Sequence, residues 1–317
     1  MKPTSFLNIG IDLCQNLQLY NIPKDFIDEL SQKFPLCKIY FLNCENESKN
    51  IPYEKISIYF GNRISKNIYD KLKNLKWIHF GSVGVNRLND INFNNKIKVT
   101  NSSGMMTRSV SIHALSFILA FSRGVNYSTI LKEKKDLTRK SYDSQFNFTS
   151  DLVGEKIAIF GRGLIGNDLN KILTFLGADV TLFGRDFFNS NNYNLLKNFN
   201  YYVNILPLDK SSEKKFDKIF FNSVSVNSVF INIGRGETVD ENALLEALDL
   251  NKIRAAALDV FDSEPLKMSN PLLNYENVLL TPHIAGLHNK YWSKQKVLFL
   301  ENLRRFIANT TLLNKVN

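Results

Sequence analysis

Residues 157–173 read IAIFGRGLIGNDLNKIL. The apolar run Ile157–Phe160 predicts a strand, and the apolar spacing that follows it predicts a helix. Gly161, Gly163 and Gly166 lie at the junction between the two. A second apolar run at 178–183 predicts the next strand, so the whole stretch predicts the first turn of a parallel α/β sheet.

Glycines at this spacing are typical of a dinucleotide-binding turn. The first allows a tight turn, the second lets a pyrophosphate approach the backbone, and the third lets the helix pack closely on the sheet. The free N–H groups at a helix N-terminus also favour bound phosphate. Three glycines alone arise in ordinary turns, but the flanking strand and helix favour the dinucleotide interpretation.

The composition favours a globular protein of two domains. The chain has 317 residues, of which 44% are hydrophobic, and a net charge of +10. Such a charge suits nucleic acid, a membrane surface or small anions. The basic residues are spread along the chain, and the run at 131–140 includes Glu133 and Asp136. We interpret that run as a solvated helix face or arm, and we expect neither nucleic acid nor a membrane as partner.

Cysteine usage and the N-terminus indicate a cytoplasmic location. Cys14, Cys37 and Cys44 have neither the paired count of a disulfide framework nor CxxC spacing, so no metal site is predicted. The first residues lack the uninterrupted apolar core of a signal peptide, and no later run is long enough to cross a bilayer.

Further predicted elements divide the chain. Strands at 38–42 and 56–60 and a helix at 25–30 indicate a small α/β domain over residues 1–98. A strongly apolar helix at 112–121 leads into a longer α/β region. A final amphipathic helix is predicted at 291–306, with apolar positions at Trp292, Val297, Leu298, Leu303 and Phe306.

Further motifs occur in a fixed order with the glycine turn. They are KWIHFGSVGV at 76–85, INIGRGETVDENAL at 231–244, LDVFDSEPL at 258–266 and TPHIAG at 281–286. In this order the sequence resembles the D-isomer-specific 2-hydroxyacid dehydrogenases over nearly its whole length. The resemblance implies two Rossmann-like domains, each a doubly wound parallel α/β sheet, with a cleft between them. Residues 99–286 would bind the dinucleotide, and residues 1–98 with 287–317 would bind the substrate.

Reduction of a 2-keto acid needs a cation for the carboxylate and carbonyl, a proton donor for the new alkoxide, and a group that keeps the donor charged. The resemblance assigns these roles to Arg235, His283 and Glu264. Each taken alone could instead be a surface arginine, a structural histidine or a loop carboxylate. His79, His113 and His288 lie in no such motif, and we interpret them as core or surface residues.

The resemblance also implies binding residues. Backbone N–H groups of Val83 and Gly84 would bind the substrate carboxylate, although this segment is also typical of a strand-to-helix turn. Asp259 would approach the nicotinamide carboxamide, and Pro207 would line the adenine side. The expected cofactor-binding residues are Gly161, Arg162, Gly163, Leu164, Ile165, Gly166, Gly184, Arg185, Pro207, Ile233, Asp259, His283 and Gly286.

The end of the second strand favours NADP over NAD. An NAD-binding chain places Asp or Glu about twenty residues after the glycine turn, where it accepts from the ribose 2′-OH. Here Gly184 stands there, and Arg185 offers a guanidinium for a 2′-phosphate. In the alternative interpretation the segment is an ordinary turn from which Asp186 reaches back to the ribose.

The resemblance implies a cytoplasmic, homodimeric reductase of a small 2-keto acid such as glyoxylate or hydroxypyruvate. Phosphite oxidation on the same fold and a dinucleotide-sensing corepressor stay open as alternatives. Formate dehydrogenases of this family carry Gln as the partner of the histidine, so Glu264 argues against that chemistry. Arg63 is either solvated or a contact for a distal phosphate or carboxylate.

Overall fold

The computed structural model describes residues 6–13, 21–42, 51–83, 91, 94–190 and 192–316. The chain divides into two compact units, one made of Met1–Met106 and Leu287–Asn317 and the other of Thr107–Gly286. The first segment of the first unit ends at Met106, later than the boundary expected after residue 98. The reason is that β5 (Lys98–Thr100) pairs with β4 (Trp77–Phe80) and so completes the first sheet.

The first unit is a parallel sheet with strand order β2-β1-β3-β4-β5. Alternate residues of each strand face opposite sides. Ile9 and Ile11 pack with Phe26 of α1 and Phe299 of α9 on one face, whereas α2 covers the other. The remaining elements of this unit are β1 (Leu7–Asp12), α1 (Lys24–Lys33), β2 (Cys37–Phe41), β3 (Ile58–Gly61), α2 (Lys66–Lys71) and α9 (Tyr291–Ile307).

Helix α9 confirms the predicted C-terminal helix, and Trp292, Leu303 and Phe306 of its predicted apolar face pack on the core. Its buried residues include Phe299 and Leu303, and also the polar Gln295 and Asn302. Val297, expected to be an apolar core position, is 70% exposed. The buried amides have partners, because Gln295 bonds to His79 and Ser102 and Asn302 bonds to Leu313. In a pattern of apolar spacing, a buried polar residue looks the same as a surface residue. The sequence therefore could not place Gln295 and Asn302 in the core.

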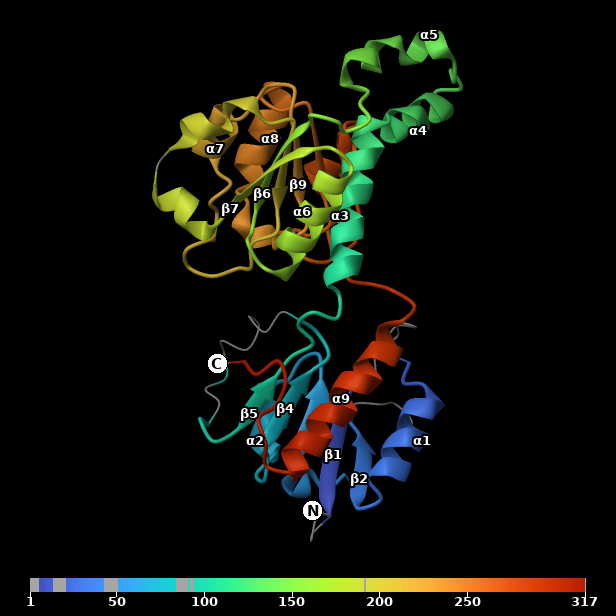
Figure 1. The fold of residues 1–317 in the computed structure, drawn as a ribbon, viewed down its shortest axis with the longest axis vertical. Helices are drawn as coiled ribbons and strands as arrows, with labels where there is room; N and C mark the ends of the chain where they lie inside the picture. The colour runs from blue at the N-terminus through green and yellow to red at the C-terminus, as the bar shows by residue number, and fades with distance from the viewer. Residues whose placement is uncertain are drawn as a thin grey trace. The chain divides into compact units, whose positions relative to one another are not determined.

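The second unit is a parallel sheet with strand order β11-β10-β9-β8-β6-β7. In β6, Ala158 and Phe160 belong to the core that α7 and α8 cover, whereas Ile159 faces α6. Figure 1 shows the helices on both faces of this sheet. Its strands and helices are α3 (Thr107–Ser122), α4 (Val125–Glu133), α5 (Arg139–Tyr142), β6 (Lys156–Phe160), α6 (Leu164–Phe175), β7 (Asp179–Phe183), β8 (Tyr201–Asn204), α7 (Lys218–Ser223), β9 (Val229–Asn232), α8 (Glu241–Asp249), β10 (Ala255–Leu258) and β11 (Val278–Leu280).

Strand β6 lies at the point where the strand order reverses. It pairs with β7 on one side and β8 on the other, and the chain then continues outward to β11. In open parallel sheets, ligands bind beyond the carboxyl ends of the strands at such a switch point. The glycine turn follows β6, so the topology places it where a nucleotide would bind.

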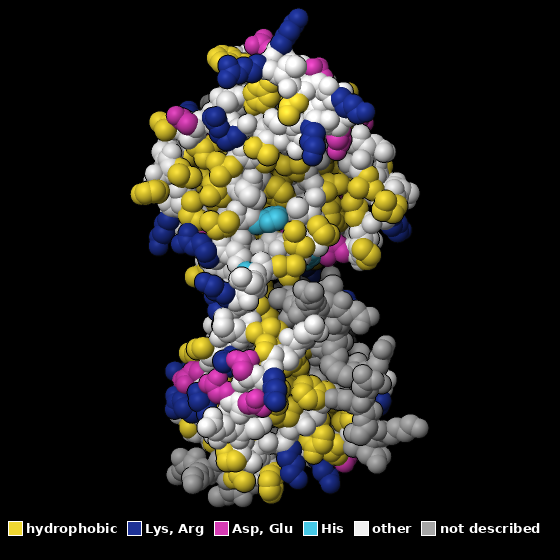
Figure 2. All heavy atoms as spheres, turned by 90° about the vertical axis from the view of Figure 1, so that its right-hand side faces the viewer, with side chains coloured by type: hydrophobic (Ala, Val, Ile, Leu, Met, Phe, Trp, Pro, Cys, Tyr) yellow, Lys and Arg dark blue, Asp and Glu magenta, His cyan; other side chains and the backbone are white. Residues whose placement is uncertain are grey.

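Residues 125–148 leave the body of the second unit. They form α4, α5 and a 3₁₀ segment (Asp143–Phe148), and Figure 1 shows them projecting beyond the end of α3. Residues 132–140 are exposed, as expected for a solvated arm. Lys and Arg side chains are spread over the face drawn in Figure 2. Among the described residues, no helix combines the length and apolarity required to cross a membrane.

Candidate active site

The glycine turn has the backbone geometry that its sequence predicts. Gly161 adopts a φ of +138°, a conformation that side chains disfavour. A Cβ on Gly166 would lie 1.9 Å from the carbonyl oxygen of Gly161, so only glycine lets α6 pack this closely. A Cβ on Gly163 would meet nothing within 4 Å. Open space therefore lies in front of Gly163, the N-cap of α6.

This turn fits the pyrophosphate of a dinucleotide. Helix α6 spans twelve residues and begins at Leu164, directly behind the open space at Gly163. Its first-turn N–H groups carry the partial positive charge of the helix end. Arg162 and Leu164 are exposed beside it, and Ile165 is half-buried with its carbonyl accepting from Ser111. The turn thus offers backbone donors and an arginine to an anion.

The strand end after β7 differs from the expected arrangement of a freely available Arg185. That guanidinium pairs with Asp209 instead. Asp186 folds back over Gly184 and lies 3.4 Å from Arg162 Nη1. Asp186 thus reaches back over the end of the strand, and its expected contact with the ribose stays a prediction. Both arginines at this edge have a carboxylate partner.

His283 and Glu264 lie together in the second unit. His283 Nδ1 is 2.8 Å from Glu264 Oε2, and Glu264 Oε1 accepts from the N–H of Phe261 at 3.2 Å. An ionised carboxylate can only accept, so Nδ1 carries a proton and Nε2 takes no part in this bond. The His283 side chain is 44% exposed, whereas Glu264 is 22% exposed. The pair is therefore accessible but anchored.

Buried amides hold the loop that carries Arg235. Asn204 and Asn232 end β8 and β9, and the Asn204 Nδ2 donates to Asn232 Oδ1 at 2.9 Å and to Thr238 Oγ1 at 2.7 Å. The Arg235 carbonyl accepts from Asn232 Nδ2 at 3.2 Å and from Thr238 Oγ1 at 2.6 Å. These positioning residues escaped the sequence analysis because their amides resemble ordinary strand-end residues.

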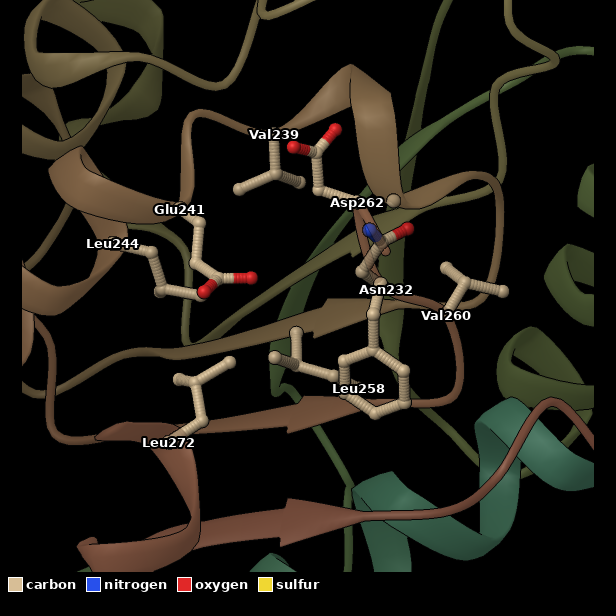
Figure 3. Close-up of a pocket in the computed structure, with 10 residues that line it drawn as sticks. Asn232, Val239, Glu241, Leu244, Leu258, Val260, Asp262 and Leu272 are labelled. Atoms are coloured by element: carbon tan, nitrogen blue, oxygen red, sulfur yellow. The ribbon is translucent and has the colours of Figure 1, made fainter. Parts of the chain in front are cut away.

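A small cavity lies beside this loop. Figure 3 shows Asn232, Glu241 and Asp262 among the residues that line it. Its volume is about 10 Å³, which is room for one water at most. It is therefore too small for a keto acid.

Asp259 anchors the segment that carries His283. It is 1% exposed, and its Oδ1 accepts from Thr281 Oγ1 at 2.6 Å and from the N–H of Ile284 at 2.8 Å. Its Oδ2 accepts from the N–H of Ala285 at 2.9 Å. Both oxygens are thus engaged within the protein, and the expected approach of Asp259 to the nicotinamide carboxamide stays a prediction.

His113 contacts the same segment. Its Nε2 is 3.0 Å from Thr281 Oγ1 and 3.6 Å from Asp259 Oδ1. Since the Thr281 hydroxyl donates to Asp259, His113 Nε2 must be the donor to Thr281. Burial lowers the pKa of His113, against the opposing effect of the Asp259 charge. Sequence reasoning placed His113 in no motif because its partners are more than a hundred residues away.

Other expected site residues occupy separate places. Val83, in the first unit, is half-buried, and its carbonyl accepts from Asn101. Gly84 lies outside the described residues. The Pro207 carbonyl accepts from Ser212 at 2.6 Å, Ile233 is 5% exposed, and Gly286 is half-buried. Arg63 is exposed.

Residues 115–285 match the family model described as "D-isomer specific 2-hydroxyacid dehydrogenase, NAD binding domain". That match spans more than half of the chain. The protein belongs to this family. The resemblance seen in its motifs is therefore confirmed, and the second unit is the family's NAD-binding domain.

Relatives of this chain share about a quarter of its residues. Glyoxylate/hydroxypyruvate reductase B of Enterobacter sp. (strain 638) is 26% identical over 93% of this chain and 95% of its own length. D-3-phosphoglycerate dehydrogenase of Archaeoglobus fulgidus is 28% identical over 84% of this chain, a match that covers only 51% of that relative. The chain thus spans about half the length of the phosphoglycerate dehydrogenase.

Solved structures share the fold. A D-isomer specific 2-hydroxyacid dehydrogenase from Xanthobacter autotrophicus Py2, in complex with NADPH and MES, superposes with a TM-score of 0.81 at 21% identity. The match covers 99% of this chain and 98% of that chain. At this identity the likeness shows the two-domain, Rossmann-like architecture alone.

Proposed function

We propose that this protein is an NADP-dependent reductase that converts a small 2-keto acid, of the glyoxylate or hydroxypyruvate type, into the D-2-hydroxy acid. The observation that carries the proposal is the 2.8 Å contact between His283 Nδ1 and Glu264 Oε2 in a unit that also carries the glycine turn. The name of the Enterobacter relative supports the substrate class. The NADPH in the Xanthobacter structure supports the cofactor.

His283 serves as the proton donor in this proposal. A reduced nicotinamide bound at the glycine turn would supply a hydride to C2 of the keto acid. As charge develops on the carbonyl oxygen, His283 Nε2 gives its proton to that oxygen and ends as the neutral imidazole. Glu264 holds the ring by Nδ1 throughout and stabilises the imidazolium before transfer. In the oxidative direction the same nitrogen takes the proton back.

Arg235 binds the substrate. Its planar guanidinium can donate two parallel bonds to a carboxylate or to the carboxylate and carbonyl together. The amide network around Asn232 fixes the backbone that carries it, so less freedom is lost when the substrate binds. The backbone N–H groups of Val83 and Gly84 are proposed as the second contact of the carboxylate.

A turnover screen tests this proposal. Glyoxylate, hydroxypyruvate, pyruvate, a longer keto acid and phosphite are each assayed with NADPH and NADH, or with the oxidised forms for phosphite. The proposal expects the fastest turnover with a small keto acid and NADPH, and His283→Ala supplies the background rate. Phosphite-dependent reduction of NADP⁺ without keto-acid turnover would identify the phosphite enzyme instead. Dinucleotide binding without any turnover would favour the corepressor.

The same proposal places the protein in the cytoplasm as a homodimer. Exposed apolar side chains support the dimer: Ile112 of α3 is 47% exposed, Val125 is 58% exposed and Phe146 is 74% exposed. Figure 2 shows extensive hydrophobic surface on the α3 side of the second unit. A second copy of this chain is the partner we propose, because a two-fold dimer brings the same surface of both copies together and covers it in each.

Light scattering of the eluted protein tests the dimer. We expect Phe146→Glu combined with Ile112→Glu to halve the measured mass, because two charges would enter an apolar interface. Met268 is 90% exposed and lies in the segment between β10 and β11, so Met268→Glu is the matched control. A wild-type monomer would refute the dimer.

A further inference from the structure

We infer that Asp186 sets the balance between the two nicotinamide cofactors. Its carboxylate, folded back over Gly184, offers an acceptor to the 2′-OH of NAD(H) and must leave Arg162 before that arginine can bind the 2′-phosphate of NADP(H). The inference rests on the proposed function, which supplies a nicotinamide dinucleotide at the glycine turn. It names the residue of this chain that we expect to set the ratio of NADP(H) to NAD(H) affinity.

The first support is the position of the carboxylate. A Cβ built on Gly184 would lie 2.1 Å from Asp186 Oδ1. The carboxylate therefore occupies the place from which the side chain of an Asp at position 184 would extend. Because Gly184 has no side chain, the 3₁₀ segment Arg185–Asn189 can bring residue 186 back to this point. A carboxylate thus reaches the ribose position from two residues farther along the chain.

The second support is the partner of that carboxylate. Arg162 Nη1 lies 3.4 Å and 3.5 Å from the two oxygens of Asp186, and 3.1 Å from the Cβ position of Gly184. The Arg162 side chain is 56% exposed and that of Asp186 is 71% exposed. An exposed ion pair at this distance is weak, so a phosphate with two charges can displace the carboxylate. With Asp186 in place, however, the carboxylate repels the same phosphate.

The third support is that Arg185 is held elsewhere. It pairs with Asp209, whose Oδ1 in turn accepts from both the N–H and the hydroxyl of Ser211. The hydroxyl of Ser211 lowers the pKa of Asp209, and Arg185 adds to this effect, so the carboxylate stays charged. Of Arg162 and Arg185, Arg162 is therefore the one whose carboxylate partner lies over Gly184.

Binding of dinucleotides to the full-length apoprotein tests the inference without catalysis. Calorimetric titrations with NADP⁺, NAD⁺, 2′,5′-ADP and 5′-AMP are compared for wild type, Asp186→Asn and Arg162→Gln. Asp136→Asn is the control, because Asp136 is an exposed aspartate of the same unit in the arm at 132–140. It removes the same charge at a different place.

We expect Asp186→Asn to raise the ratio of NADP⁺ to NAD⁺ affinity at least tenfold, with the same direction for 2′,5′-ADP against 5′-AMP. Arg162→Gln should lower NADP⁺ affinity while NAD⁺ affinity changes less than threefold. Asp136→Asn should leave both ratios within twofold. These three results together support the inference.

The contrary outcomes are distinct. If wild type binds both dinucleotides and Asp186→Asn leaves the ratio unchanged, or if Asp136→Asn shifts it equally, Asp186 has no selecting role and the proposed function stands. Equal gains for both dinucleotides would also overturn the inference. If wild type binds neither dinucleotide, the proposed function itself fails.

Discussion

His283 combines exposure with a fixed ring orientation. Its backbone has a φ of +55°, and its N–H donates to the carbonyl of Thr281 at 3.0 Å. The turn therefore presents the ring outward while Glu264 fixes Nδ1. Arg235 has its own support in the amides of the preceding strands. We therefore expect removal of either side chain to leave the glycine turn in place.

We expect His283→Ala and Arg235→Ala each to lower keto-acid reduction at least about a hundredfold, because proton donation or substrate clamping is lost. NADPH binding, measured by its fluorescence, should stay within a few fold of wild type. Turnover near the wild-type rate in either variant would show that its role is misassigned.

Replacement of Glu264 tests the pairing directly. We expect Glu264→Gln to lower kcat, because a neutral amide oxygen is a weaker acceptor for the Nδ1–H of His283 than a carboxylate and holds the ring less firmly. The kcat for the best keto acid is measured beside NADPH binding, which should stay near the wild-type value. An unchanged kcat would contradict the pairing.

At the scale of elements, α3 supports the turn that carries His283. His113 projects from α3 to Thr281, and its ring packs edge-on against Phe117 with centroids 4.7 Å apart. The contact joins a helix to a loop more than a hundred and sixty residues later. Because Thr281 in turn donates to Asp259, a substitution of His113 in α3 would alter the contacts that hold the loop carrying His283.

We expect His113→Phe to lower kcat about fivefold, since the ring packs as before but the bond to Thr281, worth about 1 kcal/mol, is lost. The KM for NADPH should stay near the wild-type value. His113→Gln keeps an N–H donor and should restore part of kcat. Equal losses of kcat and of thermal stability in both variants would indicate a merely structural role.

The elements with regular patterns are those that the sequence predicts best. The turn after Phe160 and helix α6 follow from apolar periodicity and glycine spacing, which are local. The pair of His283 and Glu264 follows from motif resemblance, and the structure places the two in contact. The partner of Arg185 could not be predicted, because Asp209 reaches it from beyond a different strand. Gln295 escaped notice because its partner His79 is two hundred residues away.

At the scale of the whole molecule, the first unit contains a buried polar network around His79. Its Nδ1 bonds to Thr100 Oγ1 and its Nε2 accepts from Gln295, both at 2.8 Å. The hydroxyl of Thr100 also accepts from Trp77 Nε1 at 2.9 Å. The ring is fully buried, and burial lowers the pKa of His79 to about 3. The folded unit therefore keeps this histidine neutral.

This network makes the first unit sensitive to acid. An unfolded histidine takes a proton near pH 6.5, whereas folded His79 does not do so until about pH 3. Its contribution to stability is thus complete above pH 6.5 and is lost as pH falls toward 3, at about 1.4 kcal/mol per pH unit.

We expect urea unfolding of wild type to lose more stability between pH 7 and pH 5 than that of His79→Gln, by about 2 kcal/mol. Both tryptophans, Trp77 and Trp292, belong to the first unit, so their fluorescence follows that unit alone. Equal pH dependence in the two proteins would contradict the buried neutral state.

Helix α9 makes the first unit the last to be completed during synthesis. Residues 107–286 form a unit of their own, whereas Phe299 and Leu303 of α9 fill the core against Ile9 and Ile11. During synthesis, residues 107–286 emerge as a complete unit while the first unit still lacks the helix α9, which covers one face of its sheet. The first unit therefore starts first and is completed last. Until α9 is synthesised, the sheet of this unit exposes an apolar face that can bind chaperones or aggregate.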